Sequence, residues 1–496
     1  MIIAMNKRAR PRPAKRKQPL LFDRDEERRD LEAAIASGRP ELRIVFGRRG
    51  AGKSYLFERA LAGRRHFTHT FTERVVALQL ADIEQALNAF APGAVTGHLT
   101  SFDSFLDVLA TLAARERPGP LVVVLDEFPY LGRAERGVLT DLQRWFNVQK
   151  RKNTPIKLFL LGSMVSWMEE QALSDTAALK SVRTGQLAVH PLGYRHAAGF
   201  YPHWDAVDRV RAFGVWGGLP GVLTELGPRR SLWVNVRDST LTRGAKLYDE
   251  PDWLKYTDLR GSATYSSIVR AVASGDRRAS DIASTVFGAA SSQPKVQPYL
   301  DPLIAAQILE RRTPLLAKGE RPKTSLYFVR DPFLAYWYRF VDPDRAALDR
   351  HIWKPALARV RAGLDKYLSE DAFEQVCRAY LWDALAEGRL PRGLAFDRVG
   401  PWWSGRGQRQ DEADVVAYDR ARLTLIGECK WSGARADERD LQGLDKLLRD
   451  FASELQPAKQ VWRALFARSG FRSSLVDLAK DPAQRILLLT PADLYW

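Results

Sequence analysis

One stretch near the N-terminus has the residue types and spacing of a phosphate-binding loop. Residues 47–54, GRRGAGKS, fit the pattern G-x-x-x-x-G-K-[ST]. The glycines let main-chain N–H groups wrap around phosphates, Lys53 supplies a positive charge, and the Ser54 hydroxyl can ligate Mg²⁺. The residues predicted to hold a nucleotide here are Gly47, Arg48, Arg49, Gly50, Ala51, Gly52, Lys53, Ser54 and Tyr55.

Two adjacent acids supply the second half of this predicted site. Asp126 and Glu127 follow the apolar run LVVVL at 121–125. Asp126 is placed to hold the water shell of Mg²⁺, and Glu127 to orient or deprotonate an attacking water. Ser163 follows another apolar run, where it is a candidate sensor of the γ-phosphate; a plain strand-end serine is the alternative. Together these residues predict ATP and Mg²⁺ as ligands and hydrolysis as the reaction.

A second group of acids lies near the C-terminus, in residues 402–431. Because side chains alternate along a strand, Glu412 and Asp414 share one face, and Glu428 and Lys430 share a face of the next strand. Neighbouring strands lie about 4.8 Å apart, so Asp414 and Glu428 can converge. Converging carboxylates repel unless a cation neutralises them, and Mg²⁺ or Mn²⁺ suits oxygen ligands. Lys430 beside them is a candidate for stabilising charge on a phosphate in transfer.

The segments around the loop predict an α/β fold. Five β-type runs alternate with helical patterns, at 42–46, 74–80, 121–125, 157–161 and 186–192. Such alternation predicts a parallel sheet covered by helices, and we assign residues 21–200 to this P-loop domain. The loop lies between a predicted strand and a predicted helix, which is the context that phosphate binding requires.

Three further segments follow. Residues 201–258 lack a strand pattern and predict a helical lid, whereas 259–345 have the three helices and hairpin of a winged helix. Residues 346–496 predict a C-terminal α/β domain. DNA contact and a rigid coupling role are both open for the winged helix, whose hairpin carries Arg311, Arg312, Lys318, Arg321 and Lys323. Pro294, Pro298 and Pro302 predict that its third helix starts late or bends.

Composition narrows the class of protein. Of the 496 residues 45% are hydrophobic and 27% charged, which excludes wholesale disorder. The longest apolar runs fall far short of the roughly 18 residues that span a bilayer, and no membrane association is expected. Two cysteines, Cys377 and Cys429, predict a reduced, cytoplasmic chain. The net charge is +17, and the basic, flexible tail at 1–20 is either a non-specific phosphate anchor or a solubilising segment.

Several motifs in order resemble the archaeal-type P-loop ATPases of the STAND class. They are FDRDEE (22–27), GRRGAGKS, VLDEFPYL (124–131), LLGSMVSWMEE (160–170), PLGYRHAAGFYP (191–202) and GVWGGLPGVL (214–223). The resemblance implies that the GGLP segment, 217–220, belongs to a helical subdomain that packs on the nucleotide. The family's usual Gly-Arg-Arg-Thr is Ser181-Val182-Arg183-Thr184 here. Arg183 is therefore a candidate γ-phosphate contact, with a surface cation as the alternative.

The C-terminal pattern resembles the PD-(D/E)XK nuclease core. The resemblance rests on a helix with Glu374, a strand with Asp414 and the Glu428-x-Lys430 strand end. It implies metal-dependent cleavage of nucleic acid, with DNA as the expected partner, and it adds Glu374 to the metal ligands. We expect an ATPase whose nucleotide state controls DNA binding and cleavage. A non-nucleolytic STAND-type switch is the alternative, and a homo-oligomer or a protein partner is left open.

Overall fold

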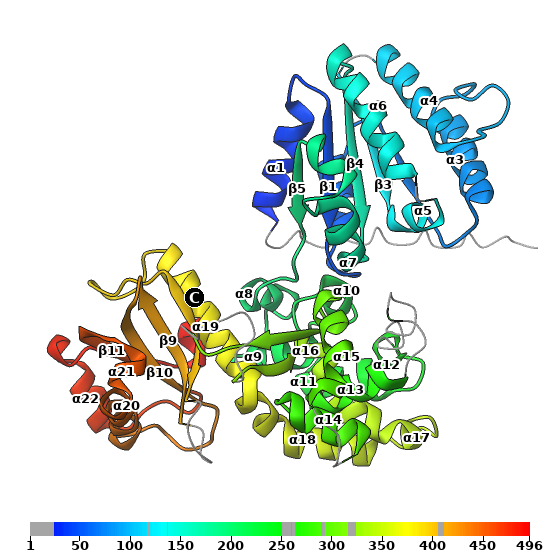
Figure 1. Ribbon diagram of the computed structural model, residues 1–496. Coiled ribbons are helices and arrows are strands. Elements are labelled where there is room, and N and C mark those ends of the chain that lie inside the picture. The colour runs from blue at the N-terminus through cyan, green and yellow to red at the C-terminus, as the bar shows by residue number, and fades with distance from the viewer. Residues whose placement is uncertain are drawn as a thin grey trace, which may run out of the picture.

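The computed structural model describes residues 24–116, 119–135, 137–249, 259, 263–288, 293–315, 324–404 and 411–496. The basic segment at 1–20 and Lys318, Arg321 and Lys323 lie outside these residues. Two five-stranded sheets, joined by a helical region, make up the α/β fold that the sequence predicts (Figure 1).

The N-terminal sheet is entirely parallel, with strand order β2-β3-β4-β1-β5. Its strands are β1 (Glu41–Phe46), β2 (His66–Thr70), β3 (Leu121–Asp126), β4 (Ile156–Gly162) and β5 (Gly185–Ala188). Its helices are α1 (Asp25–Ala36), α2 (Lys53–Ala60), α3 (Val76–Phe90), α4 (Phe102–Arg115), α5 (Pro129–Ala134), α6 (Val138–Lys152) and α7 (Val165–Trp167), followed by the single turns η1 (Met168–Leu173) and η2 (Ala178–Ser181).

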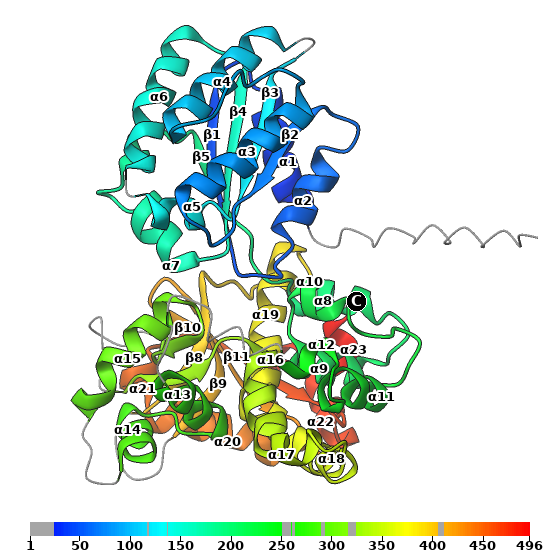
Figure 2. The same cartoon turned by 90° about the vertical axis from the view of Figure 1, so that its right-hand side faces the viewer.

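Helices cover both faces of this sheet, as apolar strands require. Alternate residues of one strand enter different cores, because side chains point to opposite faces. In β1, Val45 packs with α1 and α2, whereas Leu42 and Ile44 pack with α3, α4 and α6. Figures 1 and 2 show the sheet between these two helical layers.

One predicted strand is wrong. Helix α3 begins at Val76, within the predicted strand 74–80, and the strand at this place in the fold is β2, with the sequence HFTHT. The buried residues Leu80, Ile83 and Leu87 repeat at helical spacing, which outweighs the β-type start of the segment. β2 is a polar edge strand that pairs only with β3 among the described strands, so it lacks the apolar run used to find strands.

The helical region follows the first sheet. Its first elements, α8 (Tyr194–Ala197) and η3 (Ala198–Phe200), precede the segment predicted as a lid, 201–258. That segment contains α9 (Ala206–Trp216), α10 (Pro220–Leu223), α11 (Leu232–Val236), η4 (Arg237–Leu241) and α12 (Lys246–Asp249). The segment predicted as a winged helix contains α13 (Ala263–Ser274), α14 (Ala279–Phe287), α15 (Gln293–Ala305) and the antiparallel hairpin of β6 (Leu309–Arg312) and β7 (Leu326–Val329). Helix α15 runs through Pro298 and Pro302, so it does not start late. The helices after the hairpin are α16 (Pro332–Tyr336), η6 (Trp337–Val341), η7 (Asp342–Asp344), α17 (Arg345–Leu348), α18 (Lys354–Tyr367) and η8 (Leu368–Ala372).

The C-terminal sheet is mixed, with strand order β12-β11-β10-β9-β8. Strands β8, β9 and β10 are antiparallel neighbours, and β10, β11 and β12 are parallel. The elements are α19 (Phe373–Ala386), β8 (Arg398–Trp403), β9 (Glu412–Asp419), β10 (Arg422–Lys430), α20 (Glu438–Asp450), α21 (Ala452–Leu455), β11 (Pro457–Ala467), α22 (Ser473–Ala479), η9 (Pro482–Gln484), β12 (Ile486–Leu489) and α23 (Pro491–Leu494).

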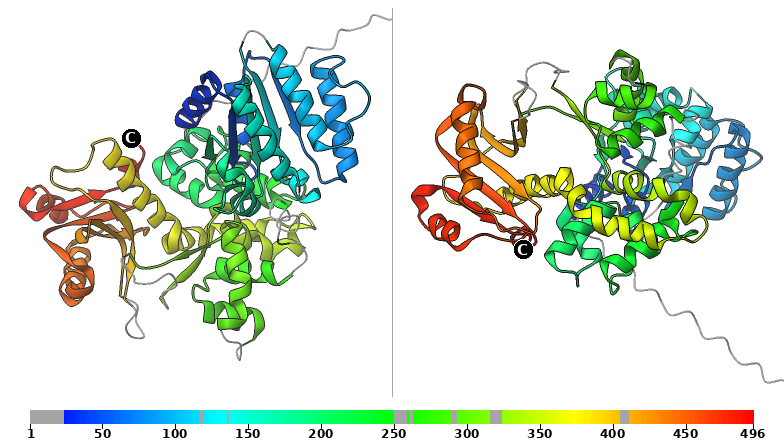
Figure 3. Two further views of the ribbon diagram at one scale, coloured as in Figure 1. Left: turned by 45° about the horizontal axis from the view of Figure 1, so that its top comes forward. Right: turned by 90° about the horizontal axis from the view of Figure 1, so that it is seen from below.

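The hairpin of β6 and β7 reaches from the helical region to the edge of this sheet (Figure 3). The Leu315 N–H donates to the Pro401 carbonyl over 3.0 Å, and Trp403 Nε1 donates to the Thr324 carbonyl over 2.9 Å. The Pro401 carbonyl and the Trp403 side chain belong to β8, the edge strand of the sheet, so these bonds satisfy polar groups that the sheet leaves unpaired. A residue after β6 and a residue before β7 therefore both contact the C-terminal domain. Within the described part of the chain, every helix is too short or too polar to cross a bilayer.

We expect Gly218→Ala to destabilise the junction between the sheet and the lid. A Cβ at Gly218 would lie 1.9 Å from the Leu192 carbonyl oxygen, a main-chain atom that no rotamer change can move away. Overpacking of this kind typically costs about 1–3 kcal/mol of unfolding free energy. Urea unfolding of the variant measures it. Gly193→Ala is the matched control, because nothing lies within 4 Å of its added Cβ, and equal stability of the two variants would contradict the steric argument.

Candidate nucleotide and metal sites

The phosphate-binding loop lies between β1 and α2, at the carboxyl edge of the parallel sheet. Gly50 and Gly52 have φ of 81° and 94°, left-handed values that residues with a side chain rarely adopt. Helix α2 begins at Lys53, so its first N–H groups point into the loop. The Ser54 hydroxyl donates to Asp126 Oδ2 over 2.7 Å. The structure thus brings together the two predicted Mg²⁺ ligands, which lie 72 residues apart in the chain.

Lys53 is a buried cation inside this loop. Its side chain is 5% exposed, and Nζ donates to the carbonyls of Gly47 at 2.6 Å and Arg48 at 3.3 Å. Burial lowers the pKa of Lys53, and the nearby carboxylates of Glu127 and Asp126 oppose that shift. A desolvated ammonium held by neutral carbonyls interacts more strongly with an anionic phosphate than a hydrated one does.

Glu127 and Ser163 contact one another at the ends of neighbouring strands β3 and β4. Glu127 Oε2 accepts from the Ser163 main-chain N–H over 3.2 Å and from its hydroxyl over 2.7 Å. The main chain of Glu127 is left-handed, with φ 51°. A non-glycine residue at positive φ is uncommon and is enriched at functional sites. The predicted base and the predicted sensor therefore form one unit.

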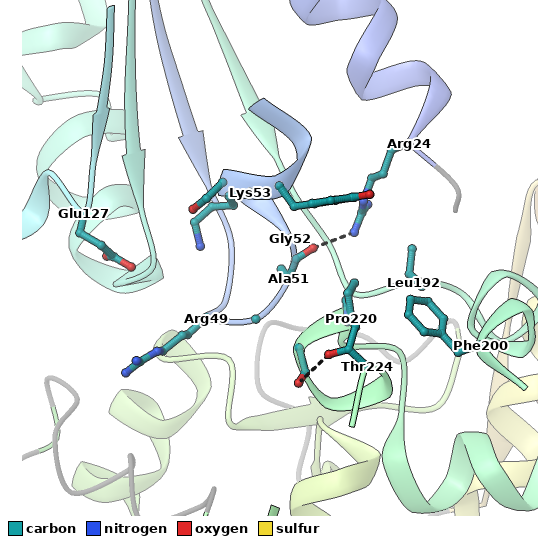
Figure 4. A pocket seen from close by; sticks show the side chains of 14 residues that line it. Arg24, Arg49, Ala51, Gly52, Lys53, Glu127, Leu192, Phe200, Pro220 and Thr224 are labelled. Carbon is teal, nitrogen blue, oxygen red and sulfur yellow. Dashed lines mark hydrogen bonds between the residues drawn. The ribbon is translucent and has the colours of Figure 1, made fainter. Parts of the chain in front are cut away.

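A cavity of about 420 Å³ opens between the loop and the lid. In Figure 4 Glu127 lies on one side of the loop, and an apolar group from the helical region gathers on the other. The lining residues are Arg24, Arg49, Gly50, Ala51, Gly52, Lys53, Ser54, Tyr55, Glu127, Leu192, Phe200, Pro220, Gly221 and Thr224. The volume and the pairing of a polar loop with an apolar wall fit a nucleotide.

Sequence reasoning assigned no role to several of these residues. The aromatic ring of Phe200 and the side chains of Leu192 and Thr224 come from the region after β5. Arg24 is buried, and its Nη2 donates to the carbonyls of Ala51 at 3.1 Å and His190 at 2.6 Å. The only sequence signal for Arg24 was its place in FDRDEE, because nothing local shows that it reaches the loop.

Gly221, the residue directly after the GGLP segment, contacts the loop. The Gly221 N–H donates to the Gly50 carbonyl over 2.9 Å, and a Cβ at Gly221 would lie 3.0 Å from Gly50 Cα. The Leu192 N–H likewise donates to the Gly218 carbonyl over 2.8 Å. Glycine is needed here because two main chains approach closely. Helix α10 therefore forms one wall of the cavity.

Two predicted phosphate contacts have other partners. Arg183 Nη1 donates to the carbonyls of Ala172 at 3.2 Å and Leu173 at 3.0 Å, and Arg183 is not among the described residues that line the cavity. The side chain of Arg48 pairs with Asp331, with 2.6 Å between Nη1 and Oδ2, and Arg48 is not among the described residues that line the cavity. The carbonyl of Arg48 remains part of the loop, through its bond to Lys53.

The second group of acids converges as predicted from strand alternation. β9 and β10 pair so that Val415 lies opposite Gly427, which makes Asp414 and Glu428 neighbours. Burial and then the charge of Asp414 raise the pKa of Glu374 well above its usual value, and the same two causes raise the pKa of Glu428 to about 8. Burial also raises the pKa of Asp414 and of Glu412. Raised pKa values in a group of buried carboxylates are typical of a site that needs a cation.

A guanidinium lies beside these acids. Arg378 Nη1 is 3.0 Å from Glu374 Oε2 and donates to the Asp414 carbonyl over 2.7 Å. Lys430 pairs with Asp440 of helix α20. Among the described residues, no group of three or more His, Cys, Asp or Glu side chains has the geometry to hold a metal ion. The predicted ligands therefore share a charge environment without forming a metal cage.

Glu374, Glu412 and Asp414 line a cleft of about 390 Å³ between the hairpin and the C-terminal sheet, whereas Glu428 and Lys430 are not among its described lining residues. The hairpin contributes Arg312 and Phe328, and strand β8 contributes Trp402 and Trp403. Both tryptophan side chains are at least 94% buried, so they cover the sheet and present little ring surface. Arg312 lies 3.9 Å from the Phe328 ring centroid within the hairpin and pairs with Asp371 of η8, which directly precedes the helix that carries Glu374.

The fold and the site together define a P-loop α/β protein with a separate C-terminal sheet domain. A family described as archaea bacterial proteins of unknown function, DUF234, matches residues 337–441. An uncharacterized protein of Methanocaldococcus jannaschii is 26% identical over 432 residues, which cover 87% of this chain and 91% of that protein. The match to this relative therefore extends over both sheets.

Two solved structures show partial similarity. The Walker-type ATPase of Pyrococcus abyssi has a TM-score of 0.48 at 20% identity, over 64% of this chain and 96% of its own. The ORC2 protein of Aeropyrum pernix, in ADPNP and ADP complexes, has a TM-score of 0.41 at 16% identity, over 67% and 96%.

Without a divalent cation, we expect the stability of the chain to fall as pH rises from about 4.5 to about 8. The pKa of Glu428 is near 4.5 when unfolded and about 8 when folded, so the folded state binds more protons in this window. Thermal unfolding at several pH values measures the effect, and Glu428→Gln should flatten the slope. Asp450→Asn, at the exposed end of α20, is the control. A slope unchanged by Glu428→Gln would contradict the raised pKa.

Proposed function

We propose that this chain binds ATP with Mg²⁺ and hydrolyses it. The observation that carries the proposal is the Ser54–Asp126 contact of 2.7 Å beside the buried ammonium of Lys53. A hydroxyl and a carboxylate next to a desolvated lysine, at the start of a helix, are the groups that a magnesium-bound triphosphate requires. The part of the cavity beside α10 and Phe200 gives room for the nucleobase of ATP.

Each residue of the site has a defined task in this proposal. Lys53 exchanges the carbonyls of Gly47 and Arg48 for phosphate oxygens. Ser54 and Asp126 would hold Mg²⁺, which would neutralise charge on the transferred phosphoryl group. Glu127 orients the attacking water and accepts its proton, after its carboxylate leaves Ser163. The hydrogen bond from Ser163 holds the Glu127 carboxylate away from the attacking water. When a γ-phosphate binds, the Ser163 hydroxyl donates to it instead, and Glu127 is released.

Lys53→Ala should abolish measurable ATP binding, because the loop loses the positive charge that contacts the phosphates. Glu127→Gln should keep binding, because its shape is retained, and should lower kcat by about 10²–10⁴-fold, the usual contribution of a general base. Equilibrium titration with MgATP and a phosphate-release assay measure the two effects. Lys152→Ala, an exposed residue at the end of α6, is the control. Wild-type turnover in both site variants would contradict the ATPase assignment.

For the C-terminal domain we propose metal-dependent cleavage of DNA phosphodiester bonds, controlled by nucleotide state. Support comes from the raised pKa values of Glu374 and Glu428 and from the placement of Glu374 and Asp414 along a cleft. In this role Glu374, Asp414 and Glu428 hold Mg²⁺ or Mn²⁺, and Lys430 leaves Asp440 to approach the scissile phosphate. The hairpin beside the cleft, in a winged-helix arrangement, contributes Arg312 to the same surface.

One observation favours a second candidate, a nucleotide switch without nuclease activity. Arg378 already bonds Glu374 and the Asp414 carbonyl, so the acids have a permanent cation beside them. In this case the C-terminal domain binds DNA, a protein partner or a second copy of the chain, and it cleaves nothing. The two candidates differ in whether a divalent cation displaces Arg378.

Plasmid cleavage with Mg²⁺ or Mn²⁺ separates the two candidates. The nuclease proposal expects nicking by the wild type and at least a hundredfold loss in Glu428→Ala, because the remaining carboxylates cannot hold the ion. Asp450→Ala should nick at the wild-type rate. Calorimetric titration of Mn²⁺ into each protein is the second readout. A wild type that neither binds Mn²⁺ nor nicks supports the switch, and nicking unchanged in Glu428→Ala would show that the ligands are wrong.

A further inference from the structure

A buried ion pair joins the phosphate-binding loop to the segment that follows the hairpin. Arg48 Nη1 lies 2.6 Å from Asp331 Oδ2, and the two residues are 283 positions apart in the chain. Their side chains are 8% and 5% exposed. Because both charges are largely removed from water, each compensates the other, and loss of one partner weakens that compensation.

Asp331 uses its two carboxylate oxygens for different elements. Oδ2 pairs with Arg48, and Oδ1 accepts from the Leu334 N–H over 3.0 Å, which caps helix α16. Strand β7 ends two residues earlier, and the intervening Arg330 N–H donates to the Ile308 carbonyl at the base of the hairpin. One carboxylate therefore contacts the loop and begins the helix that leaves the hairpin.

The first turn of α16 packs against the end of α9 and is hydrogen-bonded to Tyr367. A Cβ at Gly217 would lie 3.1 Å from Pro332 Cδ, so α9 ends in close contact with the first turn of α16. Tyr367 Oη lies 3.3 Å from the Pro332 carbonyl and 3.4 Å from that of Gly214, and its hydroxyl donates to them. Asp331 is consequently held in place by contacts that do not involve the loop.

Arg48 also contacts a residue of the proposed nucleotide site, Lys53. The Arg48 carbonyl accepts from Lys53 Nζ, the group that must move to phosphate when a nucleotide binds. The side chain of the same residue is fixed by Asp331. Arg48 therefore contacts both Lys53, through its carbonyl, and the start of α16, through its side chain.

We propose that Asp331 is a positioning residue for the nucleotide site, which sets the conformation of the loop through Arg48 and couples nucleotide binding to the β7–α16 junction. The proposal rests on the proposed ATP-binding function. Fixing the loop before binding reduces the ordering that a nucleotide must impose, so the anchored loop binds it more tightly. By linkage, a bound nucleotide stabilises the junction by the same factor.

The test is Asp331→Asn, which removes the charge and keeps a side chain that caps helices about as well. We expect MgATP affinity, measured by equilibrium titration, to weaken by about 5–150-fold, the usual range of coupling between sites. Asp205→Asn is the matched control, because Asp205 caps α9 by accepting from the Asp208 N–H over 2.8 Å and does not touch the loop. It should bind MgATP within about twofold of the wild type.

Two further readouts separate positioning from simple loss of stability. In an Arg48→Ala background, Asp331→Asn should change affinity by less than about twofold, because the residue acts through Arg48. In the wild type, MgATP should slow amide hydrogen exchange over residues 326–336, and this protection should be lost in Asp331→Asn. Thermal unfolding without nucleotide records any change in stability.

The outcomes are distinct. An Asp331→Asn variant that binds MgATP as tightly as the wild type would overturn the inference and leave the nucleotide function standing. Effects of Asp331→Asn and Arg48→Ala that add in full would also overturn it. A wild type that does not bind MgATP would overturn the nucleotide function itself, and the coupling with it.

Discussion

The structure depends on keeping one ammonium, that of Lys53, out of water beside main-chain carbonyls. Such a cation is unfavourable alone, because burial lowers its pKa, and the carboxylates of Asp126 and Glu127 offset part of that effect. The loop that surrounds it has left-handed glycines and so cannot be held by regular secondary structure. It is held from outside, by Arg24, by the Gly50–Gly221 contact and by Asp331.

These supports come from distant parts of the chain, and they explain why the loop lies at a junction between domains. Helix α10 forms a wall of the nucleotide cavity, and the segment after the hairpin anchors Arg48. The same hairpin borders the cleft of the C-terminal acids, where Arg312 pairs with Asp371. A short path of packed contacts thus connects the phosphate-binding loop with the acids, although the two sheets share no strand.

The C-terminal acids show how little separates a metal site from a salt-bridge network. Buried carboxylates require compensation, and either a divalent cation or a guanidinium supplies it. Arg378 occupies the second role beside Glu374, while Lys430 pairs with Asp440. The sequence predicted which acids approach one another, because strand alternation fixes their faces. It gave no sign of Arg378, which lies one helical turn after Glu374 and is indistinguishable in sequence from a surface residue.

The sequence by itself determined the phosphate-binding loop, four of the five strands of the parallel sheet and the convergence of Asp414 with Glu428. Each follows from local rules, namely glycine conformations, apolar runs and the alternation of side chains. It mistook the start of α3 for a strand, since β2 is polar and its place depends on pairing with β3. Only the tertiary structure decided the partners of Arg24, Arg48 and Arg183. An arginine side chain is long and finds its carbonyl or carboxylate wherever folding brings one near, so contacts between residues far apart in the chain leave no local pattern to read.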